Sequence, residues 1–395
     1  ILRGLNSDSV DLIYLDPPFN SNRNYQAPVG SKAAGAAFKD AWTLDDVDEA
    51  QHGLIAEAEP PLYEAINPAG IVHGKGMKSY LIMMGVRLLE MRRVLRDTGS
   101  IYLHCDPTAG HYLKLLMDSV FSVDGFKNEI VWHYRRWTGK ANRFQRLHDT
   151  IFFYGQTDST FNVPYEPYTD KSLKRKQNYH TRIKDGDVYV TSIDERGVRA
   201  GDVWQIPVLN SQAKERVGYP TQKPIALLER IIQASSNPGD VILDPFAGCA
   251  TACVAAEKLD RQWAGVDLSE KAYQLVRQRL ASEVRVGSAE HPRLTGWNVT
   301  HRTDIPTRDD LAKLPNYRTH KHRLYGRQEG ICNGCRILFP FRNMTVDHIV
   351  PVSRGGSDSL DNLQLLCGAC NSMKGQRSQA AFLAYLQVQG ITPYV

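Results

Sequence analysis

The chain has 395 residues, 42% of them hydrophobic and 23% charged, which is enough for two or three packed domains and excludes a disulfide-stapled miniprotein. No apolar run reaches the roughly 20 residues that a membrane-spanning helix needs, and no secretion signal opens the sequence. We therefore expect a cytoplasmic protein without a membrane partner. The sequence opens at Ile1 rather than at methionine, so we expect the first residues of the natural protein to be missing.

The charged residues are unevenly distributed along the chain. Lys plus Arg number 48 and Asp plus Glu 43, a net charge of +5. Residues 127–184 hold 12 basic and 5 acidic side chains, and residues 291–395 hold 13 and 7. Two basic stretches on an otherwise acidic chain are expected if two separate surfaces each face phosphate. On composition alone, ordinary solvated charge is the alternative.

The first predicted element is the apolar run 10–15, which is typical of a strand buried on both faces of a parallel sheet. A long loop with one short helix is expected over 20–75. Strands and helices then alternate, and the expected elements are a helix over 78–95, a strand over 100–105, a helix over 111–121, and strands over 129–132 and 150–154. The pattern is lost over 155–215, which indicates an inserted module.

The alternation returns after residue 215. The expected elements there are a helix over 223–234, a strand over 241–243, a helix over 250–259, a strand over 262–266 and a helix over 270–280. Strands that alternate with helices predict a doubly wound α/β sheet with right-handed crossovers. Residues 292–316 are polar and contain several prolines, so we expect a linker that leads to a separate small domain around the C-terminal cysteines.

A rigid polar corner, Asp16-Pro17-Pro18-Phe19, follows the first strand directly. Open α/β sheets bind ligands at the carboxyl ends of their strands. A carboxylate beside a carbonyl can accept both hydrogens of an exocyclic amino group, and the aromatic ring can stack on a flipped base. A plain turn with an aromatic plug is the alternative for these four residues alone.

A second candidate site lies near the end of the α/β part. Asp244 ends one predicted strand, a turn of small residues containing Phe246 and Gly248 follows, and Asp267 ends the next strand. This order matches a nucleoside site, in which backbone N–H groups of a tight turn face the charged tail and the second acid binds the ribose hydroxyls. Ordinary β-α-β packing, with small residues that let the helix approach the strand, is the alternative.

Residues 1–290 resemble a DNA amino-methyltransferase of the β class. The resemblance lies in the order of DPPF (16–19), SIYLHCD (100–106), YPTQKP (219–224) and LDPFAG (243–248). It implies methyl transfer from S-adenosylmethionine to the exocyclic amine of a flipped base. For the base, the resemblance implies that Asp16 and the Pro17 carbonyl bind the amine and that Phe19 stacks on the ring. For the cofactor, it implies that Asp267 binds the ribose and that Thr221 and Lys223 contact the carboxylate. The residues implied for the methionine pocket are Asp244, Phe246 and Gly248.

Within this family, Asp16 rather than serine favours N6 of adenine over N4 of cytosine, which stays the alternative, and RNA is a third candidate substrate. The chain contains no Pro-Cys pair, which argues against the covalent route to cytosine C5. Ala250 departs from the family pattern, which has a second glycine there. The basic stretch interleaves Trp132 and Tyr134 with cations, so we expect it to contact phosphate and to enter a groove of the DNA.

The seven cysteines fall into two groups. Cys105, Cys249 and Cys253 are expected to be small buried hydrophobes. The other four form two CxxC pairs, which favour zinc over disulfides in a chain without an export signal; they are Cys332, Cys335, Cys367 and Cys370.

Residues 325–377 resemble an HNH nuclease with the ββα-metal fold. The motifs are Asp347-His348, a Gly-Gly turn, Asn362, and Asn371 on the predicted helix. The resemblance implies that His348 is the general base, that Asp347 and Asn371 ligate Mg²⁺ or another divalent cation, that Asn362 orients the hairpin, and that the cysteines hold structural zinc. A zinc-stapled domain that binds DNA without cleaving it is the alternative.

The expected architecture is a Rossmann-like S-adenosylmethionine-dependent methyltransferase with a small zinc-stapled HNH domain. The expected parts are a catalytic part with DPPF (1–125), a target-recognition region (126–215), a cofactor-binding part (216–290), a linker (291–320) and the HNH domain (321–395). We expect site-specific methylation of adenine N6 in double-stranded DNA with an appended nuclease, as in restriction and modification or phage defence. A cytosine-N4 methyltransferase whose HNH domain only binds DNA is the alternative, and a homodimer is left open.

Overall fold

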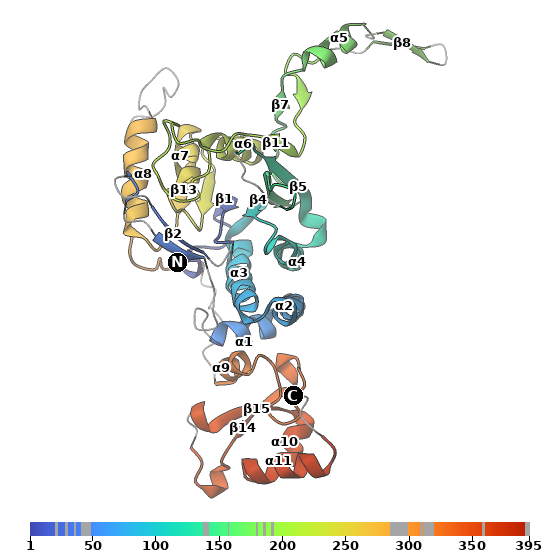
Figure 1. The fold of residues 1–395 in the computed structure, drawn as a ribbon, viewed down its shortest axis with the longest axis vertical. Coiled ribbons are helices and arrows are strands. Elements are labelled where there is room, and N and C mark those ends of the chain that lie inside the picture. Colours follow the sequence, from blue (N-terminus) through green and yellow to red (C-terminus); the bar gives the residue numbers. More distant parts are fainter. Residues whose placement is uncertain are drawn as a thin grey trace.

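The computed structural model describes residues 1–19, 23–27, 31–34, 37–40, 49–136, 142–156, 158–178, 181–184, 187–190, 193–284, 299–308, 310, 320–357 and 360–391. A central α/β body carries a narrow arm at one end of the molecule, and a small module containing the C-terminus lies at the opposite end (Figure 1). Among these residues, no helix is long and apolar enough to cross a membrane.

The central body is built on a seven-stranded sheet in the order β11-β5-β6-β4-β1-β12-β13. The strands are β1 (Val10–Leu15), β4 (Leu95–Cys105), β5 (Phe126–His133), β6 (His148–Gly155), β11 (Val203–Gln205), β12 (Val241–Asp244) and β13 (Gln262–Gly265). Strands β4, β1, β12 and β13 run parallel to one another, whereas β6 is antiparallel to both β4 and β5. The sheet is therefore mixed, with its parallel half around β1.

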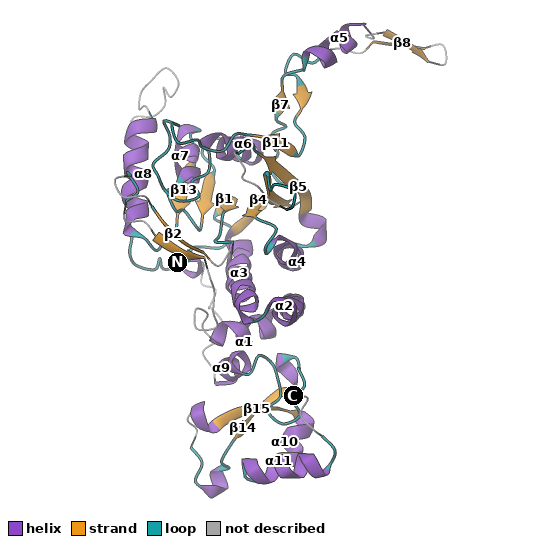
Figure 2. Cartoon of the chain, in the orientation of Figure 1, coloured by secondary structure: helices purple, strands orange, loops and turns teal. Residues whose placement is uncertain are grey.

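Helices cover both faces of the sheet, as Figure 2 shows, so the predicted doubly wound α/β fold is confirmed. Ile13 and Leu15 of β1 pack in one core with α3 (Lys75–Val94) and α4 (Gly110–Phe121). Leu12 and Tyr14 point the other way, into a core with helices α6 (Ile225–Ser235) and α7 (Thr251–Lys258). This alternation is the two-residue period of a strand buried on both faces. Helix α8 (Glu270–Glu283) packs beside α7.

The loop predicted over 20–75 is wrong, because much of this stretch is regular structure. It contains the hairpin β2 (Arg23–Gln26) and β3 (Ala37–Asp40) and the helices α1 (Glu49–Ala58) and α2 (Pro60–His73). Helix α2 has two prolines in its first turn, a third proline inside it and weak amphipathic character. Leu62, Tyr63 and Ile66 are nevertheless fully buried, so tertiary packing rather than intrinsic propensity stabilises this helix.

The stretch expected to form the target-recognition region contributes partly to the sheet. Strands β5, β6 and β11 belong to the central sheet, and the segment between β6 and β11 forms the arm. The arm elements are β7 (Tyr165–Glu166), α5 (Asp170–Asn178), β8 (Thr181–Lys184), β9 (Asp187–Val190) and β10 (Val198–Arg199). Lys171, Lys174 and Arg175 of α5 are exposed, so the arm presents a positively charged surface.

The expected groove contacts of Trp132 and Tyr134 are wrong, because both side chains are buried in the sheet. The indole N–H of Trp132 donates a hydrogen bond to the carbonyl of Ile206 over 2.8 Å. The neighbouring Arg135 and Arg136 are exposed, while Trp137 and Lys140 lie outside the described residues. The aromatic residues of the interleaved pattern thus belong to the core, and the arginines belong to the surface.

The C-terminal module has the expected hairpin followed by a helix. Its elements are α9 (His320–Arg327), β14 (Met344–His348), β15 (Leu363–Cys367), α10 (Gly368–Lys374) and α11 (Gln379–Val388). Most of the predicted linker lies outside the described residues. Short 3-10 helices elsewhere in the chain span Leu2–Gly4, Val123–Gly125, Phe341–Asn343, Val352–Arg354 and Leu360–Asn362.

The C-terminal module packs directly on helices α1 to α3 of the central body. Gly53 of α1 lies so close to α9 that a Cβ atom there would come within 2.5 Å of the His322 Cα. The rings of Tyr63 and Tyr325 lie 5.5 Å apart, and one hydrophobic cluster contains buried residues of both parts. The module and the central body therefore share a core.

An ion pair between Lys78 and Glu329 crosses this contact, with 3.2 Å between Nζ and Oε2. Only 7% of the Lys78 side chain is exposed, and burial lowers the pKa of Lys78 although Glu329 opposes that shift. Replacing Glu329 with Gln leaves a buried ammonium without its carboxylate. We therefore predict that Glu329→Gln lowers the free energy of unfolding by about 3 kcal/mol in a urea titration.

Lys75 supplies the matched control, because it binds the other oxygen of Glu329 over 3.4 Å with its own side chain 72% exposed. Lys75→Gln should cost less than about 1 kcal/mol, as exposed ion pairs do. An equal loss of unfolding free energy in the two variants would contradict the view that the buried Lys78 accounts for most of the effect of Glu329.

Candidate active sites

Three carboxylates meet at one edge of the central sheet. Asp16 follows β1, Asp244 ends β12 and Asp267 follows β13, and these three strands are parallel neighbours. Asp244 is buried, and this burial together with the charges of Asp16 and Asp267 raises the pKa of Asp244 to about 8, while Lys223 opposes the shift. An edge with three acids and one ammonium favours a positively charged ligand.

The turn after β12 is held by the same acids. Asp244 Oδ1 accepts the N–H of Phe246 over 3.1 Å, and Asp267 Oδ2 accepts the N–H of Gly248 over 2.8 Å. Gly248 has a φ of 54°, and a Cβ atom there would lie 3.2 Å from the ring of Tyr219. Both its left-handed backbone and its close approach to Tyr219 therefore favour glycine at this position.

Ala250, the residue that departs from the family pattern, has a φ of 56° and a ψ of 39°. This left-handed conformation costs an L-residue about 1 kcal/mol, which explains why glycine suits the position. The buried Arg279 holds the turn on either side of Ala250, since it donates to the carbonyl of Cys249 over 3.1 Å and to the hydroxyl of Thr251 over 2.9 Å. These neighbours hold the backbone in its strained conformation.

The two carboxylate oxygens of Asp16 have different surroundings. Oδ2 forms an ion pair with Lys223 Nζ. Oδ1 is buried and accepts no hydrogen bond from any residue that the structure describes. The half-buried ring of Phe19 lies beside this carboxylate, with Lys223 Nζ 5.4 Å from its centre, and Pro17 is buried. The site thus presents one buried acceptor without a donor next to an aromatic ring.

Of the two residues assigned to the cofactor carboxylate, Lys223 pairs with Asp16, and Thr221 is exposed with a φ of 62°. The sequence motifs did not predict two further side chains around Asp16. His104 is fully buried at the end of β4, and Asp149 lies near the start of β6. The only sequence signal for His104 was its place within SIYLHCD at a strand end, and Asp149 had none.

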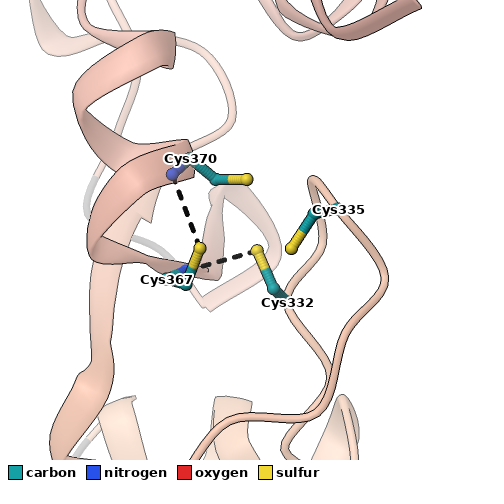
Figure 3. A group of neighbouring side chains, drawn as sticks. All are labelled: Cys332, Cys335, Cys367 and Cys370. Atoms are coloured by element: carbon teal, nitrogen blue, oxygen red, sulfur yellow. Dashed lines mark hydrogen bonds between the residues drawn. The ribbon is translucent and has the colours of Figure 1, made fainter. Parts of the chain in front are cut away.

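The four cysteines of the CxxC pairs come together in the C-terminal module. Figure 3 shows their sulfur atoms turned toward one another, and all four lie within 4.8 Å of one another. The N–H groups of Cys367 and Gly334 point at Cys332 Sγ, over 3.2 and 3.4 Å. Four buried thiols at this spacing match a tetrahedral zinc site. Cys105, Cys249 and Cys253 are buried, as predicted.

The Asp-His pair lies at the end of β14, opposite the start of β15. Asn362 bridges the loop between the strands: its Oδ1 accepts from Val350 N over 2.9 Å, and its Nδ2 donates to Ser357 O over 2.8 Å. Asn371 lies on α10, the helix that follows β15. The hairpin, the bridging asparagine and the helix therefore adopt the arrangement that the sequence predicted.

Two residues that the motifs did not predict bind Asp347 Oδ2. Gln364 Nε2 donates to it over 2.9 Å, and the fully buried Lys374 lies 3.0 Å away while also donating to the carbonyl of His348 over 2.6 Å. No hydrogen bond from a described residue reaches Asp347 Oδ1. The free oxygen leaves Asp347 able to ligate a cation.

Comparisons with known proteins identify the family of each part of the chain. The family model of DNA methylases, whose name covers N6 and N4 methyltransferases, matches residues 10–278. The chain therefore belongs to the DNA methylase family, which implies S-adenosylmethionine as the methyl donor and DNA as the substrate. The model of HNH endonucleases matches residues 332–377, so the chain also carries an HNH domain.

Curated relatives cover most of the central body. The type II methyltransferase M.HpaI of Haemophilus parainfluenzae is 26% identical over 283 residues, 71% of each chain. The DNA adenine methyltransferase YhdJ of Escherichia coli (strain K12) is 27% identical over 297 residues, 71% of this chain and 79% of that one.

Two solved structures match at lower identity. The M1.HpyAVI-SAM complex has 17% identity and a TM-score of 0.39 and covers 69% of this chain and 89% of that one. The cytosine-N4-specific PvuII DNA methyltransferase has 13% identity and a TM-score of 0.43 and covers 72% and 84%.

The raised pKa of Asp244 makes a prediction for stability. Folded Asp244 keeps its proton up to about pH 8, whereas the unfolded carboxyl loses it near its ordinary pKa of 3.8. Because the folded state binds the extra proton between these values, this residue destabilises the ligand-free protein increasingly as pH rises toward 8. The isosteric Asp244→Asn variant should therefore gain stability relative to wild type, by on the order of 4 kcal/mol between pH 5 and pH 9.

Thermal or urea unfolding at several pH values measures this difference. The control is Asp97→Asn, the same substitution at an exposed carboxylate outside the site. An Asp244→Asn profile parallel to wild type would show that Asp244 ionises normally in the folded protein.

Proposed function

We propose that the chain transfers a methyl group from S-adenosylmethionine to N6 of a flipped adenine in duplex DNA at a specific sequence. We further propose that its HNH domain cleaves DNA, as in restriction and modification or phage defence. The observation that carries the methylation proposal is the buried Oδ1 of Asp16, an acceptor without a donor beside the Phe19 ring. An exocyclic amine supplies the missing hydrogen bond, and the ring supplies a stacking face.

The acceptor chemistry follows from the corner after β1. Asp16 Oδ1 and the Pro17 carbonyl would accept the two amine hydrogens, which leaves the nitrogen lone pair free to react. Pro18 fixes the backbone between them and Phe19. Lys223 pairs with Oδ2 of Asp16 and so leaves Oδ1 for the amine. The aspartate at position 16 and the similarity to an adenine methyltransferase both favour adenine over cytosine.

The donor would lie over the ends of β12 and β13. Its sulfonium and amino groups are cationic, which suits an edge where the carboxylates of Asp16 and Asp267 lie on either side of Asp244. Phe246 and Gly248 would shape the methionine pocket, Thr221 would lie near the carboxylate, and Asp267 would bind the ribose. When bound, this donor supplies the methyl group.

The arm between β6 and β11 would read the target sequence. It projects from the sheet edge that carries β11 and β5, and its helix α5 exposes Lys171, Lys174 and Arg175. Cations on a narrow projection suit contact with DNA phosphates. A homodimer stays a prediction from the sequence.

Two metals complete the proposal for the HNH domain. Zinc would be bound by Cys332, Cys335, Cys367 and Cys370 and would stabilise a domain whose own core is small. Mg²⁺ or another divalent cation would be bound by the free oxygen of Asp347 together with Asn371, beside His348 as general base. Lys374 and Gln364 would hold Asp347 in place through its other oxygen.

Methylation is tested on duplex DNA by mass spectrometry of the digested nucleosides. We predict N6-methyladenine, with Asp16→Ala reducing the rate of its formation at least about 100-fold because the amine loses a charged acceptor. Asp97→Ala, which removes an exposed carboxylate away from the site, should keep the wild-type rate. N4-methylcytosine without N6-methyladenine, or methylation of RNA alone, would refute the proposed substrate.

Cleavage is tested with unmethylated plasmid and Mg²⁺. We predict nicking or cutting that His348→Ala abolishes without a change in methylation, because the general base is lost while the central body is untouched. His111→Ala, at an exposed histidine of α4, should leave cleavage intact. If wild type binds the plasmid but never nicks it, the HNH domain serves only to bind DNA.

A further inference from the structure

A row of acidic and imidazole side chains leads away from Asp16 across three neighbouring strands. His104 at the end of β4 places Nδ1 3.8 Å from Asp16 Oδ1 and Nε2 3.4 Å from Asp149 Oδ2. The sheet order β6-β4-β1 places the three side chains side by side. His104 has no exposed surface, whereas 14% of the Asp149 side chain is exposed. The Asp16 side chain is 18% exposed although its Oδ1 atom is buried, so the row leads from this oxygen through the buried imidazole to a second, partly exposed carboxylate.

We propose that His104 passes to Asp149 the proton that Asp16 removes from the target amine during methylation. This inference rests on the proposed function of Asp16 and extends it. His104 does not touch the reacting atoms, so it is a positioning and relay residue that acts through Asp16.

The tautomer of His104 is set by Tyr14. The Tyr14 hydroxyl lies 3.0 Å from Nδ1, and burial together with the charge of Asp16 raises the pKa of Tyr14 well above its usual range. The intact O–H group therefore donates to Nδ1, which leaves the ring proton on Nε2. On the other side, burial raises the pKa of Asp149, but the hydrogen bond and charge of His104 together with Lys223 and Tyr134 lower it overall, so Nε2–H faces a carboxylate. This tautomer has its acceptor toward Asp16 and its donor toward Asp149.

Methyl transfer creates a proton that Asp16 is poorly placed to keep. The amine lone pair forms the new N–C bond, the S–CH₃ bond of the donor breaks with its electron pair on sulfur, and one N–H proton goes to Asp16 Oδ1. Lys223 pairs with Oδ2 of the same carboxylate, so a proton on Oδ1 lies beside an ammonium group. The proton is therefore driven onward to Nδ1, and the Nε2 proton leaves for Asp149.

The onward transfer needs only a small movement. The imidazole exchanges the hydrogen bond from Tyr14 for one from Asp16, which closes the 3.8 Å separation by less than about 1 Å. At the far end, Tyr134 donates to the other oxygen of Asp149 over 3.1 Å, so this carboxylate stays in place. Because the pKa of Asp149 is lowered, the proton does not stay there and leaves to solvent through the exposed part of that side chain.

A purely structural role for His104 makes different predictions. The imidazole also packs against Phe19 and Trp132, with ring centres 5.7 and 5.5 Å away. If it only supported these rings, any molecule of the right size would replace it, and Asp149 would be dispensable.

The test is single-turnover methylation of duplex DNA by the full chain, at saturating donor and DNA. We expect His104→Ala to slow methyl transfer at least about 100-fold, the scale of lost proton transfer. Added imidazoles should restore the rate, more so as the pKa of the added azole rises. Asp149→Asn should be slowed about tenfold, and added imidazole should not rescue it. Tyr102→Phe is the control, because Tyr102 lies on the same strand as His104. Its buried hydroxyl bonds Ser235 of α6 and does not contact Asp16.

The outcomes separate the relay from the function on which it rests. Wild-type protein that methylates no adenine would overturn both. An active wild type with His104→Ala within threefold of it would overturn the relay alone, and so would rescue independent of azole pKa. Should His104→Ala fail to fold by circular dichroism, Asp149→Asn decides: a reduced rate with normal DNA affinity supports the relay, and a wild-type rate overturns it.

Discussion

The ion pair between Asp16 and Lys223 is the interaction on which the central site depends. It joins the end of the first strand to the loop before α6, more than two hundred residues later in the sequence. Lys223 also opposes the rise in the pKa of Asp244 that burial and the charges of Asp16 and Asp267 cause. The pair occupies Oδ2 of Asp16, while Oδ1 accepts no hydrogen bond from any residue that the structure describes.

The sequence predicted well those elements that are stabilised by packing within the central sheet and its covering helices. The run 10–15 became β1 because all of its residues except Asp11 face one of two hydrophobic cores. Helices α1 and α2 could not be predicted, since they are stabilised by contact with a module almost three hundred residues away. Trp132 was misassigned for a related reason: a buried aromatic residue next to exposed arginines has the same local pattern as a DNA-binding surface.

The candidate sites divide in the same way. Asp16, Asp244 and Asp267 could be predicted because strand ends and small-residue turns are visible in the sequence. His104, Asp149, Arg279 and Lys374 could not, because what they contact is decided by strand pairing and helix packing. These four side chains contact the motif residues or the backbone that carries them. The motifs therefore identify the reacting groups, and the fold determines which side chains hold those groups in place.

The shared core between the HNH domain and helices α1 to α3 also bears on how the two parts can be separated. Leu324 and Tyr325 lie in the same cluster as Tyr63 and Ile66, so the peptide linker is not what holds the halves together. Proteolysis within the linker would yield a nicked but associated complex. An HNH domain expressed alone would expose this apolar surface and aggregate. The two parts are therefore joined by their packing as well as by being encoded in one chain.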